Sequence, residues 1–191
     1  MSRSRLKKSL FGLVILFTPL FVMAAVPDWK IIPKESSLKF TATQNGAPVS
    51  GQFKSFDAEI HFDPDKLDES KIKITVQLTS LTTPYKDLTD TLITPSWFDA
   101  KAFPQAIFEA SHFSKLDKDK YQADGTLTIR DKSAPVTLIF TADQSQKDKA
   151  IVKGNTTINR STFGVGQGEW SSTKEIKDPV EVNFVVTAEK K

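Results

Sequence analysis

Apolar and polar residues alternate with a period of two over most of this chain. The clearest case runs from Ile72 to Leu78, where every second residue is apolar and those between are polar. A strand with one buried face has this pattern because successive side chains point to opposite sides of a sheet. The pattern predicts strands at 38–42, 56–62, 72–78, 136–141 and 180–187, with further candidates at 29–32, 106–113, 121–130 and 151–158.

Turn-forming residues such as Asn45-Gly46 separate these stretches. One segment departs from the alternation: in residues 87–94, Leu88 and Leu92 stand four apart, which predicts a single short helix. A loop bracketed by prolines follows and holds three large aromatic residues, Trp97, Phe98 and Phe103. Loops rarely hold three such residues without a place to bury them. We therefore expect this loop to pack on one end of the fold as a lid.

Eight or more strands with almost no helix predict an all-β fold, either a sandwich or a closed barrel. An eight-stranded barrel has an interior just wide enough for side chains or for one ligand. Alternation alone does not say which face points inward, since an outer-membrane barrel also alternates, with its apolar face toward lipid. The polar positions carry charges such as Glu59, Lys73 and Lys153, which fit either water or a polar lumen. The pattern leaves the soluble barrel and the outer-membrane barrel both open.

The first 24 residues have the order of a secretory signal peptide. Four basic residues precede an apolar run from Leu10 to Met23, and Ala24 and Ala25 follow it. This run of 14 residues is shorter than the roughly 20 that a spanning helix needs, although a retained N-terminal anchor is the alternative. We expect residues 1–24 to be cleaved and residues 25–191 to form one domain in the periplasm.

Cleavage would change the charge of the protein. The precursor has a formal net charge of +3, and losing the four basic residues of this segment takes it to about −1. A nearly neutral protein has no long-range field to attract nucleic acid. The chain has no cysteine, which excludes both a lipoprotein anchor and disulfides. We expect no nucleic-acid partner and no stable membrane insertion after cleavage.

No group of residues predicts catalysis, a metal site or a cofactor. His61 shares a predicted strand face with Glu59 and Asp57, but common metal sites need three or four converging ligands. Ser111 beside His112 is not a triad, because a nucleophile needs a base presented across space and a third group that orients it. The glycines of segment 164–168 lack the following lysine and helix of a phosphate-binding loop. We predict a binding protein, not an enzyme.

Several segments, taken in order, resemble the YceI-like family, whose members are periplasmic, lipocalin-like barrels associated with isoprenoid and lipid binding. The most specific segment runs from Asp90 to Asp99 and on through Phe103-Pro104 to Ser111. The others are 29–40, 49–56 with 60–64, 125–130, 159–166 and 178–188. Two departures are Trp97, where phenylalanine is commoner in the family, and Asp131, where a glycine is expected after Arg130.

The resemblance implies an eight-stranded antiparallel lipocalin-like barrel with one short helix and an elongated apolar cavity. The candidate ligand-binding residues are apolar residues within strands, although each would equally suit a packed core: Phe40, Phe56, Ile60, Ile74, Val76, Leu127, Phe140 and Phe184. The expected mouth holds Trp97, Phe98 and Phe103. Arg160 is a candidate contact for a ligand head group, with a structural ion pair to Asp178 as the alternative.

Two functions follow from these expectations. The first is a periplasmic carrier or scavenger of a long-chain isoprenoid, such as a quinone or polyprenyl lipid, or of a similar amphiphile, held in the barrel interior without covalent change. The second is a protein-interaction module with a packed core, no ligand, and a partner surface around the aromatic loop. The sequence leaves the head group and the oligomeric state open, a homodimer included.

Overall fold

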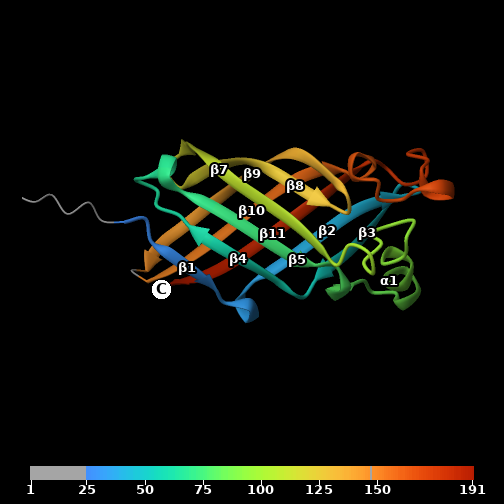
Figure 1. The fold of residues 1–191 in the computed structure, drawn as a ribbon, viewed down its shortest axis with the longest axis horizontal. Coiled ribbons are helices and arrows are strands. Elements are labelled where there is room, and N and C mark those ends of the chain that lie inside the picture. The colour runs from blue at the N-terminus through green and yellow to red at the C-terminus, as the bar shows by residue number, and fades with distance from the viewer. Residues whose placement is uncertain (1–24, 147) are drawn as a thin grey trace, which may run out of the picture.

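A single antiparallel sheet runs around the molecule and closes on itself (Figure 1). The structure is a computed structural model that describes residues 25–146 and 148–191, so the predicted signal peptide, 1–24, lies outside the described residues. The strands are β1 (Asp28–Ile31), β2 (Ser37–Gln44), β3 (Ala47–Phe53), β4 (Phe56–His61), β5 (Lys71–Gln77), β6 (Leu81–Thr82), β7 (Gln105–Asp117), β8 (Lys120–Ile129), β9 (Lys132–Gln146), β10 (Lys149–Asn159) and β11 (Pro179–Lys190). The α-helix is α1 (Lys86–Leu92), and the 3₁₀ turns are η1 (Pro33–Glu35), η2 (Leu67–Glu69), η3 (Leu78–Ser80), η4 (Arg160–Phe163) and η5 (Gly168–Trp170).

Six of these 11 segments form three longer strands, each of which is interrupted once along its length. β1 and β2 both pair with β11 and are separated by η1, which begins at Pro33, a residue without a backbone N–H to donate to a ladder. Lys54-Ser55 separates β3 from β4, and η3 separates β5 from β6. With each pair counted once, eight antiparallel strands remain, and β1 closes the ring by pairing with both β4 and β11. The predicted eight-stranded barrel is confirmed.

The local predictions hold at the turns and the helix. Asn45 and Gly46 join β2 to β3 with φ values of 48° and 78°, the left-handed pair that a tight hairpin needs. The predicted helix at 87–94 is α1, which begins one residue earlier and ends at Leu92. No helix among the residues that the structure describes is both long and apolar enough to cross a membrane.

The apolar face of the sheet is the inner one. Ile72, Ile74 and Val76 of β5 line the interior. Lys73, between them, pairs on the outside with Glu109 of β7, with 3.2 Å between Nζ and Oε1, and these two side chains are 42% and 61% exposed. The strands thus place apolar side chains on the inside and charged ones on the outside, which answers the question that alternation left open.

The two ends of the barrel are built differently. At the end that holds β1 and the C-terminus (Figure 1), the Phe62 ring contacts those of Tyr121 and Phe140, with centroids 5.5 and 6.0 Å apart, and the Trp29 indole donates to the Phe62 carbonyl at 3.0 Å. The opposite end is covered by α1, by the loop that follows it and by segment 160–178. Tight aromatic packing closes the first end, and longer connections cover the second.

Candidate ligand-binding site

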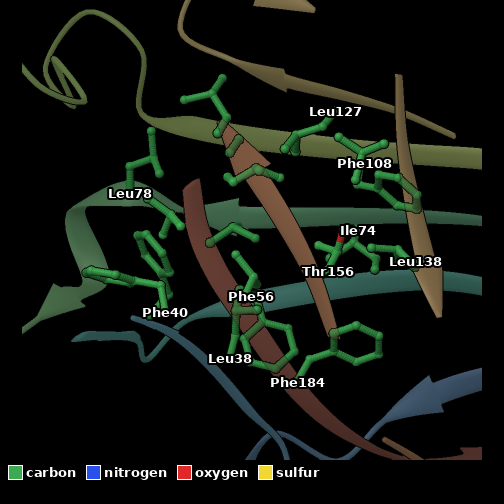
Figure 2. A pocket seen from close by; sticks show the side chains of 18 of the residues that line it. Leu38, Phe40, Phe56, Ile74, Leu78, Phe108, Leu127, Leu138, Thr156 and Phe184 are labelled. Atoms are coloured by element: carbon green, nitrogen blue, oxygen red, sulfur yellow. The ribbon is translucent and has the colours of Figure 1, made fainter. Parts of the chain in front are cut away.

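The barrel encloses an apolar cavity of about 380 Å³ that reaches from Trp29 near one end to Trp97 at the other. Its wall is made by the inward-facing residues of the strands, as the close view in Figure 2 shows for Ile74, Phe108 and Phe184. Ligand pockets are typically clefts of roughly 300–1,000 Å³ with mostly apolar walls. The cavity therefore has the size and the chemistry of a site for an apolar ligand.

The middle of the barrel is hollow and not packed. Phe40, Ile74 and Phe184 point inward from mid-strand positions, yet each remains only partly buried. Ala123 and Leu81, which do not line the cavity, are by contrast 0% and 2% exposed. Interiors of folded proteins are close-packed, so inward-facing side chains normally lose nearly all their accessible surface. The inner surface that stays accessible belongs to the cavity wall.

All eight residues predicted from mid-strand apolar positions lie on this wall: Phe40, Phe56, Ile60, Ile74, Val76, Leu127, Phe140 and Phe184. Of these, Phe140 is 7% exposed and also belongs to the aromatic cluster at the closed end. The same alternation could have identified further wall residues, such as Leu38, Val152 and Val182, which occupy the same strand faces. Their contact with a ligand stays a prediction.

The aromatic loop contributes two of its three large residues to the cavity. Trp97 and Phe98 line it, whereas Phe103 does not and instead lies under the Arg130 guanidinium, 5.7 Å from Cζ to the ring centroid. Arg130 also donates from Nη1 to the carbonyls of Pro95 and Trp97, at 2.6 and 2.5 Å. These contacts fix the loop to the turn between β8 and β9, so Phe103 helps to hold the loop in place.

Arg160 also lines the cavity, but its donors are largely used. The side chain is 3% exposed and donates from Nη1 to the carbonyls of Val165 and Gly166, and from Nη2 to those of Ser172 and Ile176, at 2.9–3.2 Å. Burial lowers the pKa of its guanidinium below the usual value, and the nearby negative charge of Asp178 opposes this shift. Its main structural role is to hold segment 160–178 over the end of the barrel.

The alternative predicted for Arg160 is a direct ion pair with Asp178. In the structure the Asp178 carboxylate instead binds Ser161. Asp178 accepts hydrogen bonds from the backbone N–H and the hydroxyl of Ser161, at 2.8 and 2.9 Å. These bonds tie η4 to the start of β11. Sequence reasoning did not find the four carbonyls around Arg160, because segment 160–178 has no hydrophobic periodicity that would show how it folds back.

Among the described residues, four buried side-chain polar atoms have no partner: Thr82 Oγ1, Trp97 Nε1, Arg130 Nε and Arg160 Nε. Those of Trp97 and Arg160 lie at the covered end, where the Arg160 Cζ is 5.9 Å from the centroid of the Trp97 ring. The Trp97 ring also contacts the Trp170 ring, with centroids 5.7 Å apart. A buried donor without a partner costs about 1–3 kcal/mol. Both belong to cavity-lining residues, so this end is where a polar ligand group would find free donors.

The two histidines lie on different strands and have separate surroundings. His61 pairs with Asp28 across β1 and β4. His112 has its Nδ1 3.5 Å from the hydroxyl of the adjacent Ser111, on an exposed surface. Within residues 25–146 and 148–191, no three His, Cys, Asp or Glu side chains are grouped so that they could hold a metal ion.

Comparison with known proteins identifies the family. The model of the YceI-like domain matches residues 29–188. A UPF0312 protein of Pseudomonas putida is 28% identical over 163 residues, which cover 82% of this chain and 80% of that protein.

Solved structures share the barrel. The crystal structure of BcnA from Burkholderia cenocepacia has a TM-score of 0.78 and 32% sequence identity, over 82% of this chain and 98% of that one. The YceI protein of Campylobacter jejuni has a TM-score of 0.66 and 28% identity, over 76% and 86% of the two chains. A polyisoprenoid binding domain from Saccharophagus degradans, implicated in plant cell wall breakdown, has a TM-score of 0.68 over 86% and 99% of the chains, but its 12% identity shows a shared fold only. With its matched domain spanning nearly all of the described barrel, this chain belongs to the YceI-like family.

Proposed function

We propose that this protein is a periplasmic carrier or scavenger of a long-chain isoprenoid, a quinone or polyprenyl lipid, held in the barrel without covalent change. The observation that carries the proposal is the hollow apolar lumen, whose wall residues stay accessible in the middle of the barrel. An interaction module with a packed core would have buried them. The Saccharophagus degradans protein of the same fold is a polyisoprenoid binding domain, which supports this ligand class.

The shape of the lumen favours a long, slim chain. β11 has 12 residues, which at about 3.3 Å per residue and a tilt of about 40° extend roughly 30 Å along the barrel axis. The interior of an eight-stranded barrel is just wide enough for side chains or one ligand, so the lumen is long and narrow. A flexible hydrocarbon chain fits this space better than a compact ring system does.

Burial of the chain would supply the affinity. A tail that buries on the order of 600 Å² gains roughly 15 kcal/mol at about 25 cal/mol per Å². Association itself costs about 4–15 kcal/mol, so a short chain would bind weakly and a long one tightly. The affinity therefore requires a long tail and depends little on the head group. The unpartnered donors of Trp97 and Arg160 are the polar contacts open to that head group.

Native mass spectrometry tests the proposal. The mature protein would be isolated from the periplasm of a bacterium that produces it, without detergent, and sprayed before and after extraction with organic solvent. We expect an N-terminus at Ala25 or Val26 and an added lipid mass that the solvent removes. A homogeneous apo mass in the native preparation, together with no uptake of added polyprenol, would contradict a carrier function.

A further inference from the structure

Three glycines on the inner face of the barrel are each covered by a phenylalanine ring from the neighbouring strand. A Cβ added at these glycines would lie 2.4–2.6 Å from the Cζ atom of the ring, closer than any real Cβ contact. No residue other than glycine therefore fits beneath these rings where they now lie. The pairs are Gly51 with Phe40, Gly154 with Phe184, and Gly125 with Phe108.

The glycines allow the rings to lie along the wall. Phe40 and Gly51 are directly opposite each other on β2 and β3, so the Phe40 ring reaches sideways over the partner strand and not toward the barrel axis. Phe184 and Gly154 are opposite each other in the same way on β11 and β10. Both rings are seen on the cavity wall in Figure 2. This placement keeps two large side chains from filling the lumen.

At Gly51 the ring is the main obstacle to a larger residue. An added Cβ would meet the Phe40 Cζ and Cε1 atoms at 2.4 and 2.5 Å, while the nearest backbone atom, the Thr82 carbonyl oxygen, is 3.1 Å away. At Gly154 and Gly125 a backbone carbonyl oxygen lies at 2.5 and 2.4 Å, so substitution there would also strain the sheet. Gly51 is thus the position where the lumen can be changed with least damage to the barrel.

The surroundings of Phe40 determine where its ring would move. It packs on Phe53, with ring centroids 5.8 Å apart, and Phe53 packs in turn on Phe98 of the aromatic loop, at 5.9 Å. Phe53 and Phe98 also line the cavity, so the open space next to the Phe40 ring is the lumen itself. A side chain at position 51 would push the ring into the lumen.

We propose that Gly51, through Phe40, sets the width of the lumen and thereby selects a methyl-branched polyprenyl chain over a slimmer straight chain. This inference rests on the proposed function, since it concerns the same cavity. A polyprenyl chain carries a methyl branch on every isoprene unit and so needs a wider passage than a straight alkyl chain. Moving the Phe40 ring off the wall would remove that extra width first.

The test is competition between two probes, a polyprenol and a straight-chain alkanol of similar mass, at equal concentrations, read by native mass spectrometry. We expect the wild type to favour the polyprenol and Gly51→Ala to shift the ratio toward the alkanol by about tenfold, a change of about 1.4 kcal/mol. Adding Phe40→Leu to Gly51→Ala should restore the wild-type ratio, because the smaller side chain no longer blocks the lumen. Gln52→Ala, at the exposed neighbouring position, is the control and should behave as the wild type.

An unchanged ratio in folded Gly51→Ala would overturn the inference, as would a shifted ratio that Phe40→Leu does not restore. If Gly51→Ala gives no cooperative thermal transition, Phe40→Trp decides instead, because the larger ring over an intact glycine should narrow the same passage. An unchanged ratio in that variant would also overturn the inference. A wild type that takes up neither probe contradicts the proposed function itself, so the two failures are distinguishable.

Discussion

The Thr156 hydroxyl donates a hydrogen bond to the Thr137 carbonyl at 2.8 Å, where the backbone ladder between β9 and β10 has stopped. The last residue pair of that ladder is Asn155 opposite Ile139, although β10 continues to Asn159 and β9 begins at Lys132. A side chain therefore bridges a seam in the barrel wall. Thr156 also faces the cavity (Figure 2), so one residue joins the wall and lines the lumen.

We expect Thr156→Val to lower the free energy of unfolding by about 1 kcal/mol, the usual net contribution of such a bond to stability. Valine keeps the shape and the β-branch of threonine, so the change in free energy reports the hydrogen bond alone. Urea denaturation measures it, with Thr157→Val on the exposed face of the same strand as the control. Equal stability of the two variants would mean that the seam does not depend on this bond.

Thr137 has a second role on the outside of the barrel, where its hydroxyl donates to Asp124 at 2.6 Å. This bond, followed by one from the Gln122 amide, lowers the pKa of the Asp124 carboxyl. A lowered folded-state pKa adds stability that is present above the usual carboxyl pKa and is lost as the pH falls through the folded value. We expect Thr137→Val to lower the melting temperature at pH 7, and this deficit to shrink at a pH well below about 4. A deficit that is the same at both pH values would rule out this linkage.

Truncations should distinguish the wall of the cavity from the packed core. Leu81 is 2% exposed and does not line the cavity, so Leu81→Ala should leave a void and cost about 2–5 kcal/mol whether lipid is present or not. Ile74→Ala enlarges a space that already exists, so it should cost less in the apo protein. Its cost should rise in the lipid-bound protein, because ligand contacts are then lost as well.

Thermal melts of both variants, with and without bound polyprenol, measure these differences. If Ile74→Ala costs the same in the apo and bound states, the Ile74 side chain does not contact the ligand.

Trp97 should affect how a ligand enters and leaves. Trp97→Phe keeps an aromatic ring in the loop but removes the unpartnered Nε1 donor and part of the contact with Trp170. We expect faster dissociation of bound lipid and little change in the melting temperature of the apo protein. Phe103→Leu, in the same loop but off the cavity wall, is the matched control. Stopped-flow transfer of lipid to acceptor vesicles gives the rates, and identical rates for Trp97→Phe and the wild type would show that Trp97 does not gate the cavity.

The strand faces could be predicted from the sequence because alternation encodes them directly. β5 and β11 show this best, since every second residue from Ile72 to Val76 and from Val180 to Ala188 is apolar and lines the lumen. Alternation could not predict whether the apolar face points into the barrel or outward, because both orientations give the same pattern. The resemblance to the family implied the inward orientation, and the structure confirms it.

The lid could be predicted only in part. Trp97, Phe98 and Phe103 are equivalent as aromatic loop residues in the sequence. In the structure the Phe103 ring lies under the guanidinium of Arg130, 27 residues further along the chain, whereas Trp97 and Phe98 line the cavity. The surroundings of Arg160 depend likewise on a segment that folds back without periodicity. Such contacts join segments that are far apart in the sequence, and the spacing of residues along the chain does not reveal them.

Protection of single cysteines from a thiol reagent tests whether the barrel interior holds an apolar chain. The chain has no cysteine of its own, so Ile74→Cys inside and Lys73→Cys outside form a matched pair on adjacent residues of β5. Each variant would be treated with a small thiol reagent, with and without an equimolar polyprenol, and the rate of labelling followed by mass spectrometry. We expect the lipid to slow labelling of the Ile74→Cys variant about tenfold and to leave that of the Lys73→Cys variant unchanged. Equal labelling of the Ile74→Cys variant with and without lipid would show that the barrel interior does not hold the chain.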